Sequence, residues 1–172
     1  VFEPNQACSD GRQILVIAIQ NRNVHMVKSI LEKFGRSVDV NVETKDGKTP
    51  LIIACGLGET EMVKLLLDCE LIKTNKTATS DGSTPFMAAA KSGNVEILKM
   101  LMNDEDVDIY AENNKGMTAI HFAFFSQHIE AVKFLLPLFN DKLNDRIKTG
   151  ETLFQVACKN NKIELSKLLI DN

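Results

Sequence analysis

Apolar residues in this chain gather in pairs of short clusters, and a polar turn containing a glycine precedes each pair. The clearest copies read TKDGKTPLIIACGLGETEMVKLLL from Thr44 and TSDGSTPFMAAAKSGNVEILKMLM from Thr79, with further copies from Asn113 and Ile147 and a degenerate one from Ser9. The marker glycines of the five copies lie 36, 35, 34 and 34 residues apart: Gly11, Gly47, Gly82, Gly116 and Gly150. Self-similarity at this period predicts a solenoid of stacked units.

The local signals within one unit predict a turn, a helix, a sharp reversal and a second helix. Asp46-Gly47 is a turn dipeptide, because glycine accepts the positive φ of a tight turn. Thr49 stands where its oxygen can accept a hydrogen bond from an unpaired helical N–H, and Pro50 suits the first helical position. Gly58 is expected to end this first helix in a left-handed conformation. The matching residues elsewhere are Gly82, Thr84, Pro85, Gly93, Thr118 and Thr152.

These residues resemble the ankyrin repeat family over most of the chain, above all in the two copies quoted and in the T-A-I-H of Thr118 to His121. The resemblance implies an all-α solenoid of stacked helix–turn–helix units with short β-hairpin-like fingers. It also implies a slightly curved stack whose concave face usually grips another protein. We expect one domain over residues 1–172, with repeats at 9–43 (degenerate), 44–78, 79–112, 113–146 and 147–172 (truncated).

Composition and charge narrow the function classes. The chain has 172 residues and is 44% hydrophobic. Its net charge of −3 gives no overall electrostatic attraction to nucleic acid or to an anionic membrane. Its longest apolar run, Ile14 to Ile19, is far too short to span a bilayer. The first unit is apolar nearly all round, whereas an end unit needs a polar outer face. We therefore expect more chain, in the form of another repeat, before Val1.

The cysteines favour buried thiols over disulfides. Cys55 and Cys158 hold the same position in their units, where the third unit has Ala90, which indicates a small buried residue between packed helices. A disulfide between Cys55 and Cys158 is disfavoured, because the intervening repeats separate equivalent positions of different units. Cys8 and Cys69 show no Cys-x-x-Cys spacing either. We expect reduced thiols and an intracellular setting, cytoplasmic or nuclear.

No catalytic or metal motif is present, so we expect no enzyme, no cofactor and no metal site. The resemblance gives His121 a structural role, because it fills the last place of the family's T-P-L-H signature. A recurrent register of glutamates three residues before lysines predicts intrahelical ion pairs on an outer face. These pairs are Glu61–Lys64, Glu96–Lys99, Glu130–Lys133 and Glu164–Lys167.

Candidate binding residues follow from the resemblance, because partners of this family most often touch the finger tips and the inner face of the first helices. We single out Arg12, Lys45, Lys48, Leu57, Lys91, Lys115, Met117, Phe125, Lys148 and Lys159. Across the fingertip and first-helix positions of all five units, seven residues are positively charged and four are negatively charged, whereas the whole chain has a net charge of −3. A basic lining would steer an acidic partner segment. The alternative is that lysines are simply frequent on surfaces.

The fourth unit is the most specialised. Phe124-Phe125 replaces a small pair, and Gln127 replaces the helix-ending glycine. We expect Phe124 to pack between helices and Phe125 to face the groove as an anchor, core packing of both being the alternative. Pro137 is expected to end the second helix early.

The sequence therefore predicts a monomeric protein–protein interaction module that contacts neither nucleic acid nor membrane. The alternative is a structural spacer or tether within a larger multidomain protein.

Overall fold

The computed structural model describes residues 13–140, 143–159 and 162–170. Within these ranges the chain forms ten α-helices and no strand, which confirms the all-α fold. The helices come in consecutive pairs, and a 3₁₀ turn follows the second helix of the first pair. They are α1 (Ile14–Gln20), α2 (Val24–Phe34), η1 (Gly35–Ser37), α3 (Pro50–Leu57), α4 (Thr60–Leu67), α5 (Pro85–Ser92), α6 (Val95–Met102), α7 (Ala119–Phe125), α8 (Ile129–Phe139), α9 (Leu153–Lys159) and α10 (Ile163–Ile170).

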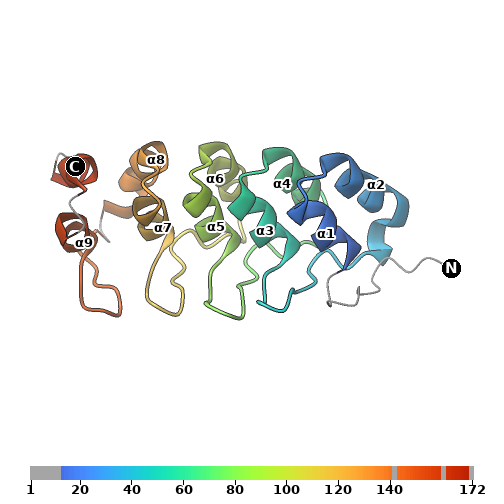
Figure 1. Cartoon of the computed structure of the whole chain (residues 1–172), viewed down its shortest axis with the longest axis horizontal. Helices are drawn as coiled ribbons and strands as arrows, with labels where there is room; N and C mark the ends of the chain where they lie inside the picture. Colours follow the sequence, from blue (N-terminus) through green and yellow to red (C-terminus); the bar gives the residue numbers. More distant parts are fainter. Residues whose placement is uncertain (1–12, 141–142, 160–161, 171–172) are drawn as a thin grey trace.

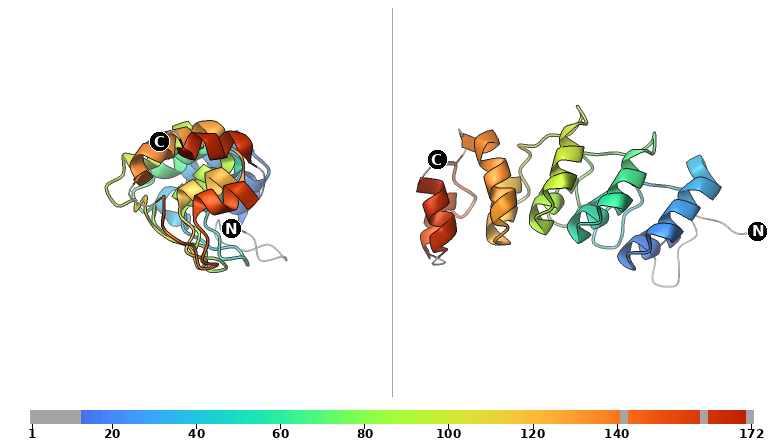
Figure 2. Two further views of the ribbon diagram at one scale, coloured as in Figure 1. Left: turned by 90° about the vertical axis from the view of Figure 1, so that its left-hand side faces the viewer. Right: turned by 90° about the horizontal axis from the view of Figure 1, so that it is seen from above.

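The helix pairs stack side by side along one axis. Figure 1 shows the odd-numbered first helices in one row and the even-numbered second helices in another, with the finger loops projecting beyond the first row. Seen end-on in Figure 2, the fingers hang from the same side of the stack. First helices pack against first helices, as α3 does against α5, and second helices pack against second helices, as α4 does against α6. Each pair therefore covers the apolar side of the next.

The first helices begin where the threonines predict. The Thr49 hydroxyl accepts the backbone N–H of Ile52 (3.3 Å), and the Thr84 hydroxyl accepts that of Met87 (3.2 Å). Pro50 and Pro85 occupy the first turn behind these caps. Each cap satisfies an N–H that has no partner inside the helix.

The first helices end at a residue with positive φ in four consecutive pairs. Gly58 (φ 73°) and Gly93 (φ 75°) take this conformation, as their sequence predicts. Arg22 (φ 54°) and Gln127 (φ 62°) take it too, although they carry a Cβ. The reversal between the two helices therefore persists where glycine has been replaced, because the packing of the pair demands it.

The core runs between successive first helices. Leu51, Phe86 and Ile120 occupy equivalent positions, and each is at most 2% exposed. Phe154 holds the same position in α9 but is 39% exposed, because no helix pair of the described chain lies on that side of it. No helix in the described ranges has the length and apolar composition that crossing a bilayer requires.

The equivalence of Cys55 and Cys158 holds in sequence but not in environment. Cys55 is fully buried, and burial raises the pKa of its thiol far above the usual range. Cys158 is exposed, so the prediction of a buried residue is wrong for it, for the reason that exposes Phe154. Cys55, Cys69 and Cys158 are free thiols, and Cys8 lies outside the described residues.

Pro137 does not end the second helix of the fourth pair, contrary to the prediction. Helix α8 continues through it to Phe139. Phe139 is 1% exposed and packs edge-on against Tyr110, with ring centroids 5.2 Å apart. Burial of this ring on the last turn favours continuing the helix, although proline removes one backbone donor.

Most of the predicted glutamate–lysine pairs do not form within one helix of the described chain. Only Glu130–Lys133 makes the intrahelical pair among the described residues (2.9 Å). Lys64 on α4 instead pairs with Glu96 on the neighbouring α6 (3.2 Å). Lys99 reaches the Phe134 ring on the next second helix, 5.6 Å from its centroid. Because second helices lie side by side, the next helix offers these ammonium groups a partner within reach.

Candidate protein-binding face

Each finger is closed by backbone hydrogen bonds around its marker glycine. In finger 44–48, the Thr44 N–H donates to the Lys48 carbonyl (3.0 Å) and the Gly47 N–H to the Thr44 carbonyl (2.8 Å). Fingers 78–83, 113–117 and 147–151 are closed by bonds from their first N–H to their last carbonyl. The fingers are thus hairpin-like turns built without assigned strands in the described chain.

Adjacent fingertips are joined by one backbone hydrogen bond each. The pairs are Thr79 N–H to Gly47 C=O (3.2 Å), Asn114 N–H to Asp81 C=O (2.9 Å) and Lys148 N–H to Lys115 C=O (3.1 Å). Gly47 is required twice over. Its φ is +69°, and a Cβ at this position would lie 2.6 Å from the Thr79 nitrogen. The four fingers therefore form a connected row.

Side chains fix the individual turns. The Asp81 carboxylate accepts the Ser83 N–H (3.0 Å) and hydroxyl (2.8 Å). In finger 113–117, the buried Asn113 side chain accepts the N–H groups of Lys115 and Met117, both at 2.9 Å. Sequence reasoning missed Asn113, although asparagine is a residue type whose side chain closes turns on the backbone. These turns hold the candidate side chains on a rigid support.

The surface formed by the four fingers and the last turns of α3, α5, α7 and α9 is called the finger face below. Lys45, Lys115 and Lys148 lie in finger turns, Lys48 follows one, and Lys91 lies in the last turn of α5. All five are exposed. Within the described ranges, none of these five lysines makes an ion pair with a carboxylate.

Lys159 differs from these lysines. It makes an ion pair with Glu151, whose carboxylate also accepts the Thr149 hydroxyl (3.3 Å). The hydrogen bond from Lys159 lowers the pKa of Glu151. Lys159 therefore adds no free charge to the finger face.

The fourth pair supplies the exposed aromatic of the finger face. Phe125 ends α7 and is 43% exposed, whereas Phe124 is 1% exposed, so the expected burial of Phe124 and exposure of Phe125 are confirmed. Their rings meet edge-on with centroids 6.3 Å apart. Met117, beside the fourth marker glycine, and Leu57, at the end of α3, are half-buried. Phe125 is thus a large apolar group held on buried support.

Of the ten candidate binding residues, Arg12 lies outside the described residues. The remaining candidates come from the fingers and the first helices, and none of them from a second helix.

His121 is built into the support of its helix. It is 5% exposed, and its Nδ1 accepts the backbone N–H of Thr118 (3.2 Å) and lies 3.0 Å from the Thr118 hydroxyl. Burial lowers the pKa of the ring to about 4. The described residues contain no cluster of three or more His, Cys, Asp or Glu side chains arranged to hold a metal ion.

Comparisons with known proteins agree with this architecture. A family model described as ankyrin repeats (3 copies) matches residues 2–77 and 69–146. A fowlpox virus (strain NVSL) protein, named as ankyrin repeat protein FPV031, is 25% identical over 169 residues, which cover 95% of this chain and 48% of that protein. The transient receptor potential cation channel subfamily A member 1 of Homo sapiens is 42% identical over 53 residues, 31% of this chain and 5% of the channel. The chain thus spans about half the length of one relative and a small part of the other.

Proposed function

The chain belongs to the ankyrin repeat family, whose repeats are generally protein-interaction modules, and from this premise we propose that it binds an acidic segment of another protein through the finger face. The partner contacts the fingertips and the last turns of the first helices. The family is typically non-catalytic, and the binding role needs no catalytic activity of the chain's own.

The unpaired lysines of the finger face carry this proposal. On the second-helix side, Lys28, Lys64 and Lys133 have a carboxylate partner at 3.9, 3.2 and 2.9 Å. Three further lysines there, Lys33, Lys99 and Lys167, pair with no carboxylate of the described residues. On the finger face, the five lysines Lys45, Lys48, Lys91, Lys115 and Lys148 have no carboxylate partner among the described residues. Uncompensated positive charge on one surface attracts and orients an acidic partner.

Phe125 and Met117 give the proposed contact its apolar part. Phe125 is held by a buried neighbour, so its ring loses little conformational entropy when a partner covers it. Aromatic residues of this kind often dominate the binding energy of an interface. The lysines then raise the association rate and orient the partner, and Phe125 supplies much of the affinity. Leu57, half-buried at the end of α3, adds a further apolar group to the finger face.

The cellular setting belongs to the same proposal. Three free thiols in the described chain suit a reducing compartment, so we place the protein inside the cell, in the cytoplasm or nucleus. A module that binds along one edge of its stack needs no second copy, and we propose that it acts as a monomer.

The experiment is affinity capture with the 172-residue chain, followed by measurement of association rates for each captured protein. We expect the variant Lys45→Ala, Lys48→Ala, Lys115→Ala to associate about tenfold more slowly at low salt, and high salt to remove the difference. Phe125→Ala is expected to raise Kd about tenfold, mostly through faster dissociation.

Lys64→Ala, Lys99→Ala, Lys133→Ala is the matched control, because it removes the same number of exposed lysines from the opposite side of the stack. The control should leave association rates unchanged. Equal losses in both variants, or a rate that is flat from low to high salt, would contradict the proposal. Failure to capture any protein specifically would favour the alternative of a spacer between other domains.

A further inference from the structure

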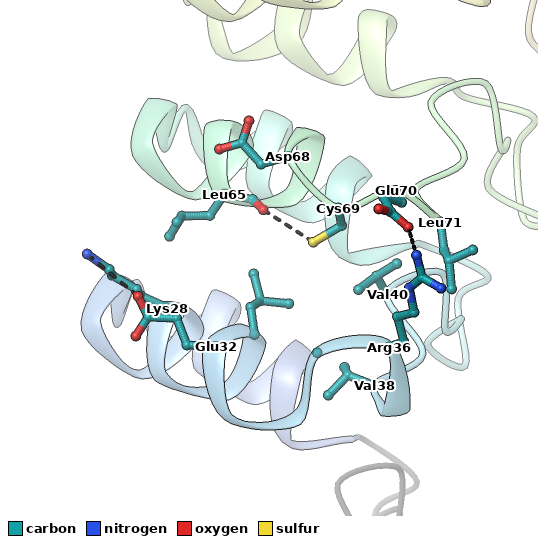
Figure 3. A pocket seen from close by; sticks show the side chains of 12 residues that line it. Lys28, Glu32, Arg36, Val38, Val40, Leu65, Asp68, Cys69, Glu70 and Leu71 are labelled. Atoms are coloured by element: carbon teal, nitrogen blue, oxygen red, sulfur yellow. Dashed lines mark hydrogen bonds and ion pairs between the residues drawn. The ribbon is translucent and has the colours of Figure 1, made fainter.

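A pocket of about 380 Å³ lies between α2 and α4, outside the finger face, and is shown in Figure 3. Its volume lies at the lower end of the range typical of ligand pockets. The lining residues come from the end of α2, from η1 and the chain after it, and from the end of α4 and the chain after it. They are Lys28, Leu31, Glu32, Gly35, Arg36, Val38, Val40, Leu65, Asp68, Cys69, Glu70 and Leu71.

The pocket arises from a mismatch between the second helices of neighbouring units. Helix α2 has 11 residues and continues into η1, whereas α4 has 8. The chain turns at Gly35, where a Cβ would meet nothing within 4 Å. The longer end of α2 therefore projects past the end of α4, and the side chains of the two ends do not fill the space between them.

The interior of the pocket is apolar and chemically inert. Leu31, Val40 and Leu65 line it, and Leu71 is 56% exposed at its edge. The Cys69 thiol donates a hydrogen bond to the Leu65 carbonyl (3.3 Å). Burial and the nearby Asp68 raise the pKa of this thiol, so it stays protonated and is a poor nucleophile. The pocket is thus suited to receiving an aliphatic group and not to reacting with it.

The rim leaves one charge uncompensated, and that charge is negative. Lys28 pairs with Glu32 (3.9 Å) and Arg36 pairs with Glu70, so both basic groups of the rim have a partner. Asp68 has no cation within ion-pair distance among the described residues. It also stands at the C-cap of α4, where the helix dipole adds negative potential. A cation is therefore the complementary group beside this pocket.

We propose that the pocket between α2 and α4 is a second docking site, which receives a leucine-, isoleucine- or methionine-sized side chain of a partner protein whose neighbouring lysine or arginine pairs with Asp68. A protein segment fits better than a free small molecule. Among the described lining residues, Asp68 is the one charged side chain without an ion-pair partner. One such group is too few to orient a small ligand, whereas a segment is oriented by its remaining contacts. The two sides of the stack thus select opposite charges.

The test is a selection from a random peptide display library on the 172-residue chain, counter-selected on Leu71→Asp. Leu71 is largely exposed, so this change places a charge at the pocket without removing core packing. We expect enriched peptides to carry an aliphatic residue beside lysine or arginine. Their Kd should rise at least about tenfold in Leu71→Asp and about fivefold in Asp68→Asn. Lys99→Ala, which lies on the same side of the stack but away from the pocket, should leave Kd unchanged.

Cys69 and Cys158 provide a site-specific reading in the same molecule. The raised pKa makes the Cys69 thiol react slowly with N-ethylmaleimide, so its alkylation is followed by peptide mapping over long reaction times. Bound peptide should slow this alkylation further and leave that of the exposed Cys158 unchanged. The proposal is overturned by a selection with no peptides sensitive to Leu71→Asp, or by sensitive peptides that lack a basic residue. Peptides whose affinity falls in the finger-face lysine variant, but not in Leu71→Asp, belong to the finger face and equally count against it.

Discussion

At the scale of single residues, Arg22 and Gln127 occupy a left-handed backbone conformation that the other units give to glycine. The conformation costs a residue with a Cβ about 1 kcal/mol or more. Arg22 offsets part of this cost through its ion pair with Glu59 of the next unit. The sequence showed that the glycine was missing, but the pair-to-pair packing that preserves the turn was visible only in the structure.

The buried His121 makes stability depend on pH. Its folded-state pKa of about 4 lies below its ordinary value of 6.5, so the folded chain prefers the neutral ring. Above pH 6.5 the ring is neutral in both the folded and the unfolded chain, so it does not reduce the free energy of unfolding. As the pH falls from 6.5 toward 4, the unfolded chain binds a proton that the folded chain does not, and the free energy of unfolding decreases. Between pH 7.5 and 4.5 we expect wild type to lose about 2 kcal/mol more than His121→Asn, measured by urea unfolding. Identical losses in the two proteins would show that the ring does not titrate on unfolding.

At the scale of elements, turn and cap residues made the helix pairs predictable, because Thr49-Pro50 and Gly58 act within their own unit. The ion pairs and the end of α8 depend on neighbouring units and were not predictable. Lys64 chooses Glu96 because α6 lies beside α4. The pocket at the end of α2 had only one sequence signal, the 36-residue spacing from Gly11 to Gly47, which is the longest of the four.

Helix α8 carries a measurable defect at Pro137. Proline leaves the carbonyl four residues earlier, that of Lys133, without its helical donor. Because Pro137 is exposed on its turn, Pro137→Ala restores the donor without disturbing the core. We expect the free energy of unfolding to rise by about 1–3 kcal/mol. Pro85→Ala is the control, since Pro85 stands in the first turn of α5 where no donor is needed, and it should give no gain. A loss of stability in Pro137→Ala would mean that proline shapes the packing of Phe139.

At the scale of the whole molecule, stability is distributed unevenly along the stack. The inner pairs are covered on both sides, whereas Phe154, Ile163 and Ile170 of the last pair are 39, 61 and 67% exposed. In a repeat stack each unit is stabilised by its own contacts and by those with its neighbours. The family and the inner helix pairs followed from the sequence. The candidate partner-binding residues rest on the family resemblance, and their role stays a prediction.

This unevenness predicts the order in which the 172-residue chain opens. Native-state hydrogen exchange should give the lowest opening free energies in α9 and α10 and the highest in α3 and α5. Replacing Ile163, which is exposed in the last pair, by lysine should change these values little. Uniform protection along the chain would indicate that the stack opens as a single unit.

The row of fingertip hydrogen bonds has a consequence for how such a surface diversifies. The bonds from Thr79 to Gly47, from Asn114 to Asp81 and from Lys148 to Lys115 join main-chain atoms only. Apart from Gly47, where a Cβ would clash with Thr79, any amino acid with an N–H and a carbonyl supplies them. The outward side chains of Lys115 and Lys148 are therefore not needed to hold the row together. Selection can therefore rewrite what the fingertips recognise, one substitution at a time, without dismantling the scaffold that presents them.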